Sequence, residues 1–339
     1  MSSGTQFPDF FRRYQRAFEA ELEAVFDGHD DSLYSMMRHQ LGWDGERMVS
    51  PGKYVRPGLL LLACEACGGD WREAVPGAVA LELLHNFSLI HDDIQDESPT
   101  RRGRPTVWDK WGAAQAINAG DGMYALSRLA LLNLRDKGVS SDRTIAAARL
   151  LDQTCVRLCA GQFDDIAFQE RPTVTIADYE GMVANKTAAV FACALEMGAI
   201  VAVGQGDVSR RLADAGRAMG IAYQMRDDVL DLWGGAETGK QVGIDLRRGK
   251  KSLPVVFGLS QEGTPEGERV RAIYSRPMTD DSVELVTRLL EGVDAPSFCM
   301  AAAEQHWDRS KSILRDLGLG EAGARSIIEA GELLVQRES

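Results

Sequence analysis

The sequence lacks the features that mark several large classes of protein. Its 339 residues include 38 lysines and arginines against 50 aspartates and glutamates, so the formal net charge is −12. Because nucleic-acid phosphates require a basic surface, this acidic balance argues against a nucleic-acid partner. Residues 1–18 contain no apolar run that ends in a small-residue cleavage site, so no signal peptide is predicted. The most apolar later stretch, residues 187–204, includes Glu196 and falls short of a membrane span, so no membrane insertion is expected.

Aromatic residues, cysteine pairs and strand patterns are also scarce. Only 7% of the residues are aromatic, although the 45% hydrophobic content is enough for a sizeable core. Cys64 and Cys67 form a lone C-x-x-C pair without a nearby histidine, so zinc is not expected and core cysteines in a reducing cytoplasm are the simpler interpretation. Residues 173–176 are the only strand-like segment, and no repeat or Pro/Ser-rich linker divides the chain. We therefore expect a cytoplasmic protein with a single all-α domain over residues 1–339.

Apolar residues recur at helical spacing along most of the chain. Pro57 opens a helix that ends at Gly68-Gly69, and Pro76 opens a long helix that carries a first cluster of aspartates. The other expected helices cover residues 10–26, 113–134, 144–168, 177–200, 208–233, 282–290, 301–316 and 321–336. Together they predict a helical bundle around a central cavity.

The chain is organised around residues 81–106, LELLHNFSLIHDDIQDESPTRRGRPT. On a helix, Asp92 and Asp96 lie one turn apart and Asp93 lies about 100° round from Asp92. Two carboxylates about 4 Å apart repel by about 4 kcal/mol near a protein surface, so a cation is needed. Three arginines suited to phosphate follow in the next loop: Arg101, Arg102 and Arg104. Since Mg²⁺ binds one or two carboxylates together with phosphate oxygens, the segment predicts a metal-held phosphate on an apolar substrate.

A second segment, residues 223–254, repeats this arrangement. Asp227, Asp228 and Asp231 have the same D-D-x-x-D spacing, and a Gly-rich loop with Lys240 and Lys250 follows. One such motif is a weak signal, because acidic clusters are usually solvated helix ends. Two motifs, each in an apolar helix and each followed by basic residues, predict a metal–diphosphate site. On these motifs, the sequence resembles the trans-isoprenyl diphosphate synthase family, also called polyprenyl synthetases, over nearly the whole chain.

The resemblance implies a fold, a reaction and a cofactor. The implied fold is an isoprenoid synthase-type helical bundle around a central apolar cavity, with the two aspartate helices facing each other across it. The implied reaction is head-to-tail condensation of isopentenyl diphosphate with an allylic diphosphate. About three magnesium ions per active site would be held by all six aspartates. The family also implies a homodimer, in which the N-terminal helices commonly serve the contact.

Several basic residues match the family's substrate motifs. Arg101 matches the arginine that contacts the allylic diphosphate, and Arg102 matches the one assigned to isopentenyl diphosphate. Lys53 and Arg56, in PGKYVRP, resemble the rest of the isopentenyl diphosphate site, although a proline replaces the first glycine of that motif and stiffens the loop. His85, seven residues before the first aspartate, matches a residue on the same diphosphate; taken alone it would be interpreted as a core histidine.

The second segment and the helix before it supply further matches. Lys186 and Thr187 resemble a lysine–threonine pair that holds charge and the reacting allyl group; taken alone, the lysine would be interpreted as reaching to water. Gln224 matches the glutamine before the second aspartate motif, and Lys240 and Lys250 match lysines beyond it. Two supporting residues of the pattern are Gln162 and Asp165.

The product length is expected to depend on the helix before the first aspartates. The growing tail would run towards the N-terminus of this helix, gaining about 5.4 Å per turn. Phe87 and Ser88 form the first level and Leu84 the next. In the resembled family, an aromatic residue with a small neighbour at these positions implies medium-chain products, here mainly geranylgeranyl diphosphate (C20), with farnesyl diphosphate (C15) or a longer product as the alternative. Side chains near Met123 or Phe163 could form the floor instead.

Two other functions share part of this pattern. A class I terpene cyclase would share the fold, the magnesium and the first aspartate motif, but would not need a second diphosphate site. A non-catalytic partner subunit typically loses aspartates from one motif. Both motifs are intact in this chain, and the basic residues for a second diphosphate are present, so condensation of two substrates is favoured.

Overall fold

The computed structural model describes residues 9–29, 31–44, 47–48, 54–234, 243–276 and 278–335. Helices account for nearly all of these residues, so the prediction of an all-α protein is confirmed. The chain divides into two compact units. The first unit comprises residues 1–155, 190–213 and 314–330, and the second comprises residues 156–189, 214–313 and 331–339. The single domain expected over residues 1–339 stays a prediction.

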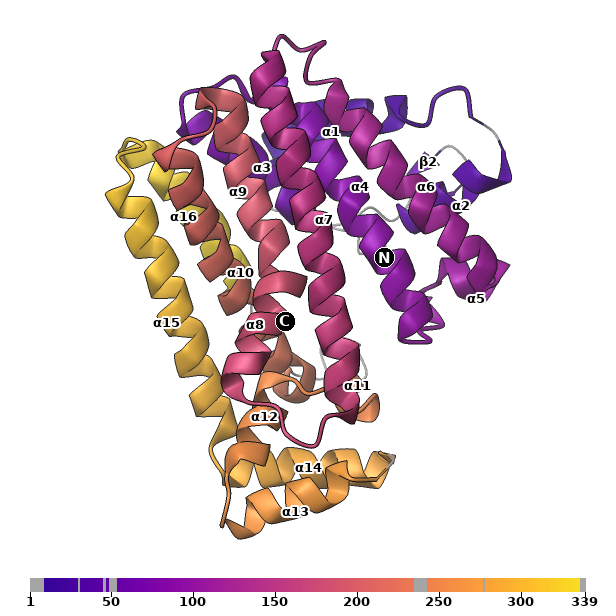
Figure 1. Ribbon diagram of the computed structural model, residues 1–339, viewed down its shortest axis with the longest axis vertical. Coiled ribbons are helices and arrows are strands. Elements are labelled where there is room, and N and C mark those ends of the chain that lie inside the picture. Colours follow the sequence, from indigo (N-terminus) through magenta and orange to yellow (C-terminus); the bar gives the residue numbers. More distant parts are fainter. Residues whose placement is uncertain are drawn as a thin grey trace. The chain divides into compact units, whose positions relative to one another are not determined.

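The first unit is built around the long helix α4 (Trp71–Gln95). Its other early elements are α1 (Arg12–Ala24), α2 (Ser32–Gln40), β1 (Trp43–Asp44), β2 (Arg47–Met48), α3 (Val55–Ala66), β3 (Thr100–Arg101), β4 (Arg104–Pro105), α5 (Val107–Trp111) and α6 (Ala113–Leu132). Helix α4 contacts α1, α3 and α5, and α6 runs alongside it (Figure 1). Because α4 carries apolar residues on all sides, most of it is buried.

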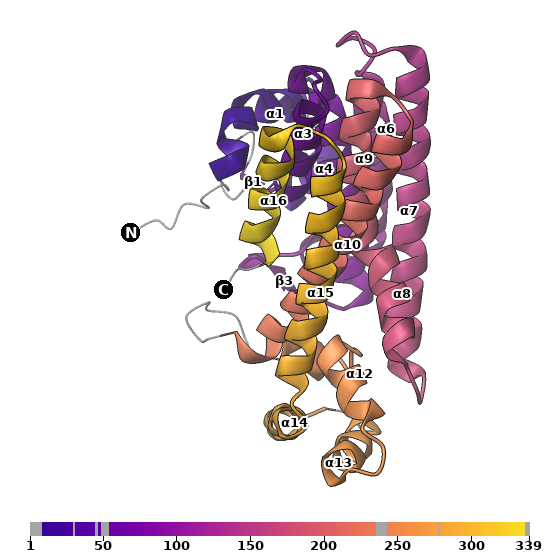
Figure 2. The ribbon, with the colours of Figure 1, turned by 90° about the vertical axis from the view of Figure 1, so that its left-hand side faces the viewer.

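In the described part of the chain, five helices contribute residues to both units: α7 (Ser141–Glu170), α9 (Ala188–Val203), α10 (Asp207–Trp233), α15 (Ala295–Asp316) and α16 (Glu321–Val335). The second unit also contains α8 (Ile176–Lys186), α11 (Ile244–Arg247), α12 (Leu253–Ser260), α13 (Pro265–Tyr274) and α14 (Asp280–Gly292). One of its apolar clusters includes Tyr179, Met225 and Leu253. Another includes Val270 and Leu290, which lie on the adjacent helices α13 and α14 (Figure 2).

Helix α4 begins earlier than the sequence predicts. It starts at Trp71, and Pro76 lies inside it rather than at its start. The Asp70 side chain caps this start by accepting a hydrogen bond of 3.0 Å from the Arg72 backbone N–H. Aspartate is a preferred N-cap residue, so the cap, and not the proline, sets the boundary.

The single helix expected over residues 177–200 is wrong. The structure has two helices there, α8 and α9, separated at Thr187, which is the C-cap of α8. In the described part of the chain, no single helix is long and apolar enough to cross a membrane; α8 and α9 satisfy that test only as a pair, and the pair is bent at this break. Residues 173–176 are not a strand, because Thr175 instead caps α8 in a capping box with Asp178.

Several short elements were not expected from the sequence. They include α2, α5 and the two hairpins β1–β2 and β3–β4, whose strands have only two residues each. The prediction of core cysteines is right for Cys64, Cys155, Cys193 and Cys299, which are buried. It is wrong for Cys159, which is exposed, and only partly right for Cys67.

Candidate active site

The first aspartate motif lies in the first unit, at the C-terminal end of α4. Its middle member, Asp93, is only 1% exposed. The Arg101 Nε donates hydrogen bonds of 2.9 and 3.0 Å to the two carboxylate oxygens of Asp93, and Arg101 Nη2 lies 3.4 Å from an oxygen of Asp92. Burial raises the pKa of Asp93, and the Arg101 guanidinium opposes that rise. Asp92 and Asp96 are partly exposed.

A tight hairpin carries the arginines that follow this motif. Arg101 pairs with Arg104 across strands β3 and β4, and Arg102 and Gly103 form the turn with φ angles of 52° and 72°. Two successive positive φ angles are typical of a type I′ turn, which matches the twist of antiparallel strands. A Cβ at Gly103 would meet no atom within 4 Å, so the backbone conformation, and not crowding, favours glycine there.

Two residues predicted to bind isopentenyl diphosphate meet between α3 and α4 of the same unit. Arg56 Nη1 lies 3.2 Å from His85 Nε2, and the Arg56 guanidinium lies 5.2 Å from the centre of the Phe191 ring. Burial lowers the pKa of His85 well below its usual value, and the charges of Arg56 and Arg102 lower it further. A neutral His85 can therefore accept a hydrogen bond from Arg56. Lys53, the fourth predicted residue of this group, lies outside the described residues.

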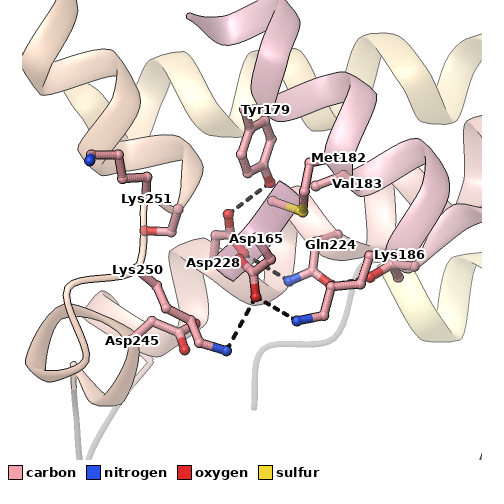
Figure 3. Close-up of a pocket in the computed structure, with 12 residues that line it drawn as sticks. Asp165, Tyr179, Met182, Val183, Lys186, Gln224, Asp228, Asp245, Lys250 and Lys251 are labelled. Carbon is pink, nitrogen blue, oxygen red and sulfur yellow. Dashed lines mark hydrogen bonds and ion pairs between the residues drawn. The ribbon is translucent and has the colours of Figure 1, made fainter. Parts of the chain in front are cut away.

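The second aspartate motif lies on α10 in the second unit. Its middle member, Asp228, is 4% exposed and accepts three hydrogen bonds, of which Figure 3 shows those from Tyr179 and Gln224. The donors are the Tyr179 hydroxyl at 2.7 Å, Gln224 Nε2 at 2.8 Å and the Leu253 backbone N–H at 2.8 Å. Burial raises the pKa of Asp228 to about 7, although all three hydrogen bonds oppose that rise.

Further predicted residues line a pocket beside Asp228 (Figure 3). Lys186 Nζ lies 2.6 Å from a carboxylate oxygen of Asp165, and Lys250 Nζ lies 3.5 Å from the same oxygen. The Thr187 hydroxyl donates a hydrogen bond of 2.8 Å to Gln224 Oε1, whose amide nitrogen in turn donates to Asp228. The break between α8 and α9 thus places Thr187 on this hydrogen-bonded chain. Lys240 lies outside the described residues.

Tyr179 and Asp245 are among the residues of this pocket that sequence reasoning missed. Tyr179, Met182, Val183 and Lys186 are spaced as positions i, i+3, i+4 and i+7, so one face of α8 faces the pocket. Tyr179 lies seven residues before the predicted Lys186, and this spacing could have indicated that both face the pocket. Asp245 is partly exposed on α11, and its backbone N–H donates a hydrogen bond of 3.3 Å to the Asp231 carboxylate.

The outer aspartates of the two motifs could hold divalent cations. Among the described residues, no group of three or more acidic, histidine or cysteine side chains could hold a metal by itself. Asp227 and Asp231, however, lie one turn apart at partly exposed positions. Burial and the nearby Asp245 raise the pKa of Asp231 to about 6, as expected where carboxylates crowd together. A pair of carboxylates completed by waters and phosphate oxygens suits magnesium, so these residues fit that ion together with a diphosphate.

The residues expected to set product length lie on the buried part of α4. Leu84 is fully buried and Phe87 is 9% exposed, while the Ser88 hydroxyl donates a hydrogen bond of 2.7 Å to the His85 carbonyl. The Phe87 ring centre lies 5.3 Å from that of Tyr124 and 5.0 Å from that of His91. Of the alternative floor residues, Met123 is buried in the first unit, whereas Phe163 in the second unit is 72% exposed.

Comparison with known proteins identifies the family. The family model described as polyprenyl synthetase matches residues 45–291. A geranylgeranyl diphosphate synthase of Mycobacterium tuberculosis (strain ATCC 25618 / H37Rv) is 36% identical over 324 residues, and a (2E,6E)-farnesyl diphosphate synthase of the same strain is 35% identical over 328 residues. Each alignment covers 94% of this chain and 90% of the relative. The crystal structure of a polyprenyl synthetase from Streptomyces coelicolor A3(2) has a TM-score of 0.88 and 31% identity, covering 96% of this chain and 98% of that one. The chain belongs to the polyprenyl synthetase family of prenyltransferases.

Proposed function

We propose that the protein catalyses the magnesium-dependent, head-to-tail condensation of isopentenyl diphosphate with allylic diphosphates, giving mainly geranylgeranyl diphosphate. The observation that carries the proposal is the repeated arrangement of an aspartate motif with cations held close by. In the first unit, Arg101 pairs with Asp93, and Arg56 and His85 contact each other. In the second, Lys186 and Lys250 lie beside the pocket at the second motif. Guanidinium and ammonium groups bind diphosphate oxygens, and Arg56 with His85 supplies a second group of this kind apart from the aspartate motifs, as a reaction with two diphosphate substrates requires.

The direct experiment supplies the pure protein with isopentenyl diphosphate and one allylic diphosphate at a time. We expect release of diphosphate that depends on magnesium and stops when a chelator removes the metal. Mass spectrometry of the products then gives the chain length. Farnesyl diphosphate as the main product would favour the alternative of a farnesyl diphosphate synthase, and products of C30 or longer would favour a long-chain enzyme.

Within each aspartate motif, the middle member would bind protein groups and the outer members would bind the metal. Asp93 and Asp228, the middle members, are buried and hydrogen-bonded to protein groups. The outer members are partly exposed, so they are the first candidates for binding the metal, and the middle members would fix the geometry around them. The outer members are Asp92, Asp96, Asp227 and Asp231. Bound magnesium would neutralise the allylic diphosphate and stabilise it as a leaving group.

Protein side chains would carry the rest of the reaction. Arg101 and Lys186 would bind oxygens of the allylic diphosphate, and their carboxylate partners Asp93 and Asp165 already hold them in place. Thr187 and Gln224 would keep the second motif in position through their hydrogen bonds to one another and to Asp228. The double bond of isopentenyl diphosphate would attack the allylic carbon, and the departing diphosphate would take up the released proton. Apolar walls would exclude water from the allylic cation.

We expect His85→Ala to weaken isopentenyl diphosphate more than the allylic substrate. The change removes a group on that diphosphate and leaves Arg56 without its contact at 3.2 Å. A charge-assisted hydrogen bond is worth about 1.5–3 kcal/mol, so the Michaelis constant for isopentenyl diphosphate should rise about tenfold or more. Lys53→Ala is expected to behave alike.

Steady-state kinetics with each substrate varied in turn would measure this effect, and His306→Ala on α15 serves as the control. An equal rise in the Michaelis constants of both substrates would show that His85 does not belong to one diphosphate site. Tight binding of a single allylic diphosphate, without any need for isopentenyl diphosphate, would instead support a terpene cyclase.

We also propose a homodimer, with the contact on α6. Ile117, Leu129 and Leu132 lie on one side of this helix and are 47%, 60% and 53% exposed. The large apolar residues of α1, by contrast, are buried within the first unit, so that helix has little apolar surface left for a partner: Tyr14, Phe18 and Leu22. Exposed apolar residues gathered on one face are typical of an interface between subunits.

The double variant Leu129→Glu/Leu132→Glu is therefore expected to convert the dimer to a monomer. Burying two carboxylates at a contact costs more than the contact gains, unless each finds a partner. Light scattering after gel filtration would give the mass, and Leu333→Glu, at a residue that is 58% exposed on α16, is the matched control. A double variant with the mass of the wild type would place the contact elsewhere.

A further inference from the structure

The hairpin that carries Arg101 and Arg102 is too small to hold its own shape. Strands β3 and β4 have two residues each, and a two-stranded hairpin is marginal in water even when it is longer. Arg102 has a φ angle of 52°, a conformation that residues other than glycine seldom adopt. The position of the Arg102 side chain must therefore depend on contacts between the hairpin and the rest of the first unit.

The β3 side of the hairpin is held by the first aspartate motif. Arg101 contacts both Asp93 and Asp92 through its guanidinium. This anchor fixes Arg101 but lies on one side only. Among the described residues, Arg102 itself forms no hydrogen bond or ion pair, so a second anchor is needed to hold the turn.

The β4 side is held by the last turn of α2. Arg104 Nη2 donates hydrogen bonds of 3.1 Å to His39 Nδ1 and 3.1 Å to the Trp43 carbonyl, and Arg104 Nη1 donates one of 3.3 Å to the His39 carbonyl. His39 Nε2 lies 2.8 Å from the Pro105 carbonyl. The His39 ring also packs edge-on against Trp111 of α5, with 5.0 Å between the ring centres.

These contacts assign a single state to His39. An arginine only donates hydrogen bonds, so His39 Nδ1 must be an acceptor, and the ring proton must lie on Nε2, where it is donated to Pro105. Both ring nitrogens are thus satisfied only in the neutral form. Burial lowers the pKa of His39, the hydrogen bond to Pro105 opposes this, and the charges of Arg104 and Lys110 lower it further, so the net shift favours the same neutral form.

We propose that His39 and Arg104 are positioning residues that hold the hairpin so that Arg102 faces the diphosphate of isopentenyl diphosphate. This inference rests on the proposed function. A small pocket between the end of α2 and the hairpin has Arg101, Arg102 and Arg104 in its lining and includes no carboxylate. Arg56 and His85, which the proposed function places on the same diphosphate as Arg102, contact each other in the same unit as the hairpin. Arg101 keeps its own anchor at Asp93, so loss of the α2 anchor should affect isopentenyl diphosphate selectively.

His39→Phe tests this directly, because it keeps a ring against Trp111 and removes both ring hydrogen bonds. We expect the Michaelis constant for isopentenyl diphosphate, and its dissociation constant measured by calorimetry, to rise about tenfold. The Michaelis constant for the allylic substrate and kcat should change less than about threefold. Arg104→Lys keeps the charge but replaces the planar guanidinium, whose two terminal nitrogens reach His39 and Trp43, by a single nitrogen. It should give the same pattern and replaces His39→Phe if that variant does not fold.

His29→Phe is the matched control, since His29 is an exposed histidine that stacks on Tyr34 at the other end of α2. It should leave both Michaelis constants unchanged. Unchanged affinity for isopentenyl diphosphate in the folded His39 or Arg104 variant would overturn the inference, and so would an equal loss for both substrates or a loss in kcat alone. Calorimetry separates failure of this inference from failure of the proposed function. Wild-type protein that binds isopentenyl diphosphate without turning it over would refute the function. Equal binding of isopentenyl diphosphate by the wild type and the variants would refute the positioning role of His39 and Arg104.

Discussion

Asp92→Asn or Asp227→Asn is expected to lower kcat/KM by about a thousandfold or more in a protein that still folds. Each change removes one carboxylate charge from the outer part of a motif and keeps the size of the side chain. A thousandfold loss corresponds to about 4 kcal/mol of transition-state stabilisation, within the range expected when a metal ligand that activates a leaving group is lost. Both residues are partly exposed, so neither change should disturb the core. Diphosphate release at saturating magnesium would measure the effect, and circular dichroism would confirm the fold.

Asp142→Asn, at an exposed position in the first turn of α7, is the matched control and should keep full activity. Near-normal turnover by either outer-aspartate variant would contradict a mechanism that uses both motifs. Asp228 offers a poorer test. Its replacement by alanine would leave the Tyr179 hydroxyl and the Leu253 N–H without their acceptor, at about 1–3 kcal/mol for each buried group. Lost activity would then be mixed with lost stability.

The sequence predicted the helices well where apolar residues recur over several turns. The expected helix over residues 113–134 agrees closely with α6, and that over 208–233 agrees with α10. Short elements were missed because four to nine residues give too few periods to detect. The proline at position 76 gave a false start for α4, since the N-cap residue Asp70, six residues earlier, satisfies the first turn.

The candidate site was predicted by residue type but not by burial. The spacing D-D-x-x-D makes the three aspartates of a motif look equivalent, yet the middle one is buried and hydrogen-bonded in each case. The hydrogen-bond partners come from other elements: Arg101 of the hairpin donates to Asp93, and Tyr179 of α8 donates to Asp228. Such partners come from elsewhere in the fold, so a local pattern cannot reveal them. His39 escaped notice for the same reason, because its partner Arg104 lies 65 residues further along the chain.

The second large effect concerns product length, and Phe87→Ala should lengthen the product by at least one isoprene unit, from C20 to C25 or beyond. If the tail runs along α4 from the first aspartates, Phe87 is the first large side chain that it meets. The ring is nearly buried and packs against Tyr124 and His91, so its position is fixed by neighbours within the first unit. Removing the ring opens a space about one helical turn deep, which is about 5.4 Å.

Chromatography with mass spectrometry, using farnesyl diphosphate as the starter, would give the product distribution. Phe163→Ala is the matched control: Phe163 is the alternative floor residue, and it is 72% exposed on α7, so its loss should leave the product unchanged. Truncating a buried phenylalanine costs about 3–5 kcal/mol, so the assay should be run well below the lowered melting temperature. The Tyr124 ring remains behind the opened space, held by a hydrogen bond of 3.0 Å to Asp152, and should limit the gain to one or two units. A Phe87→Ala variant that makes the wild-type product would show that another side chain forms the floor, and a wild type that makes C30 or longer would show that the tail does not end at Phe87 at all.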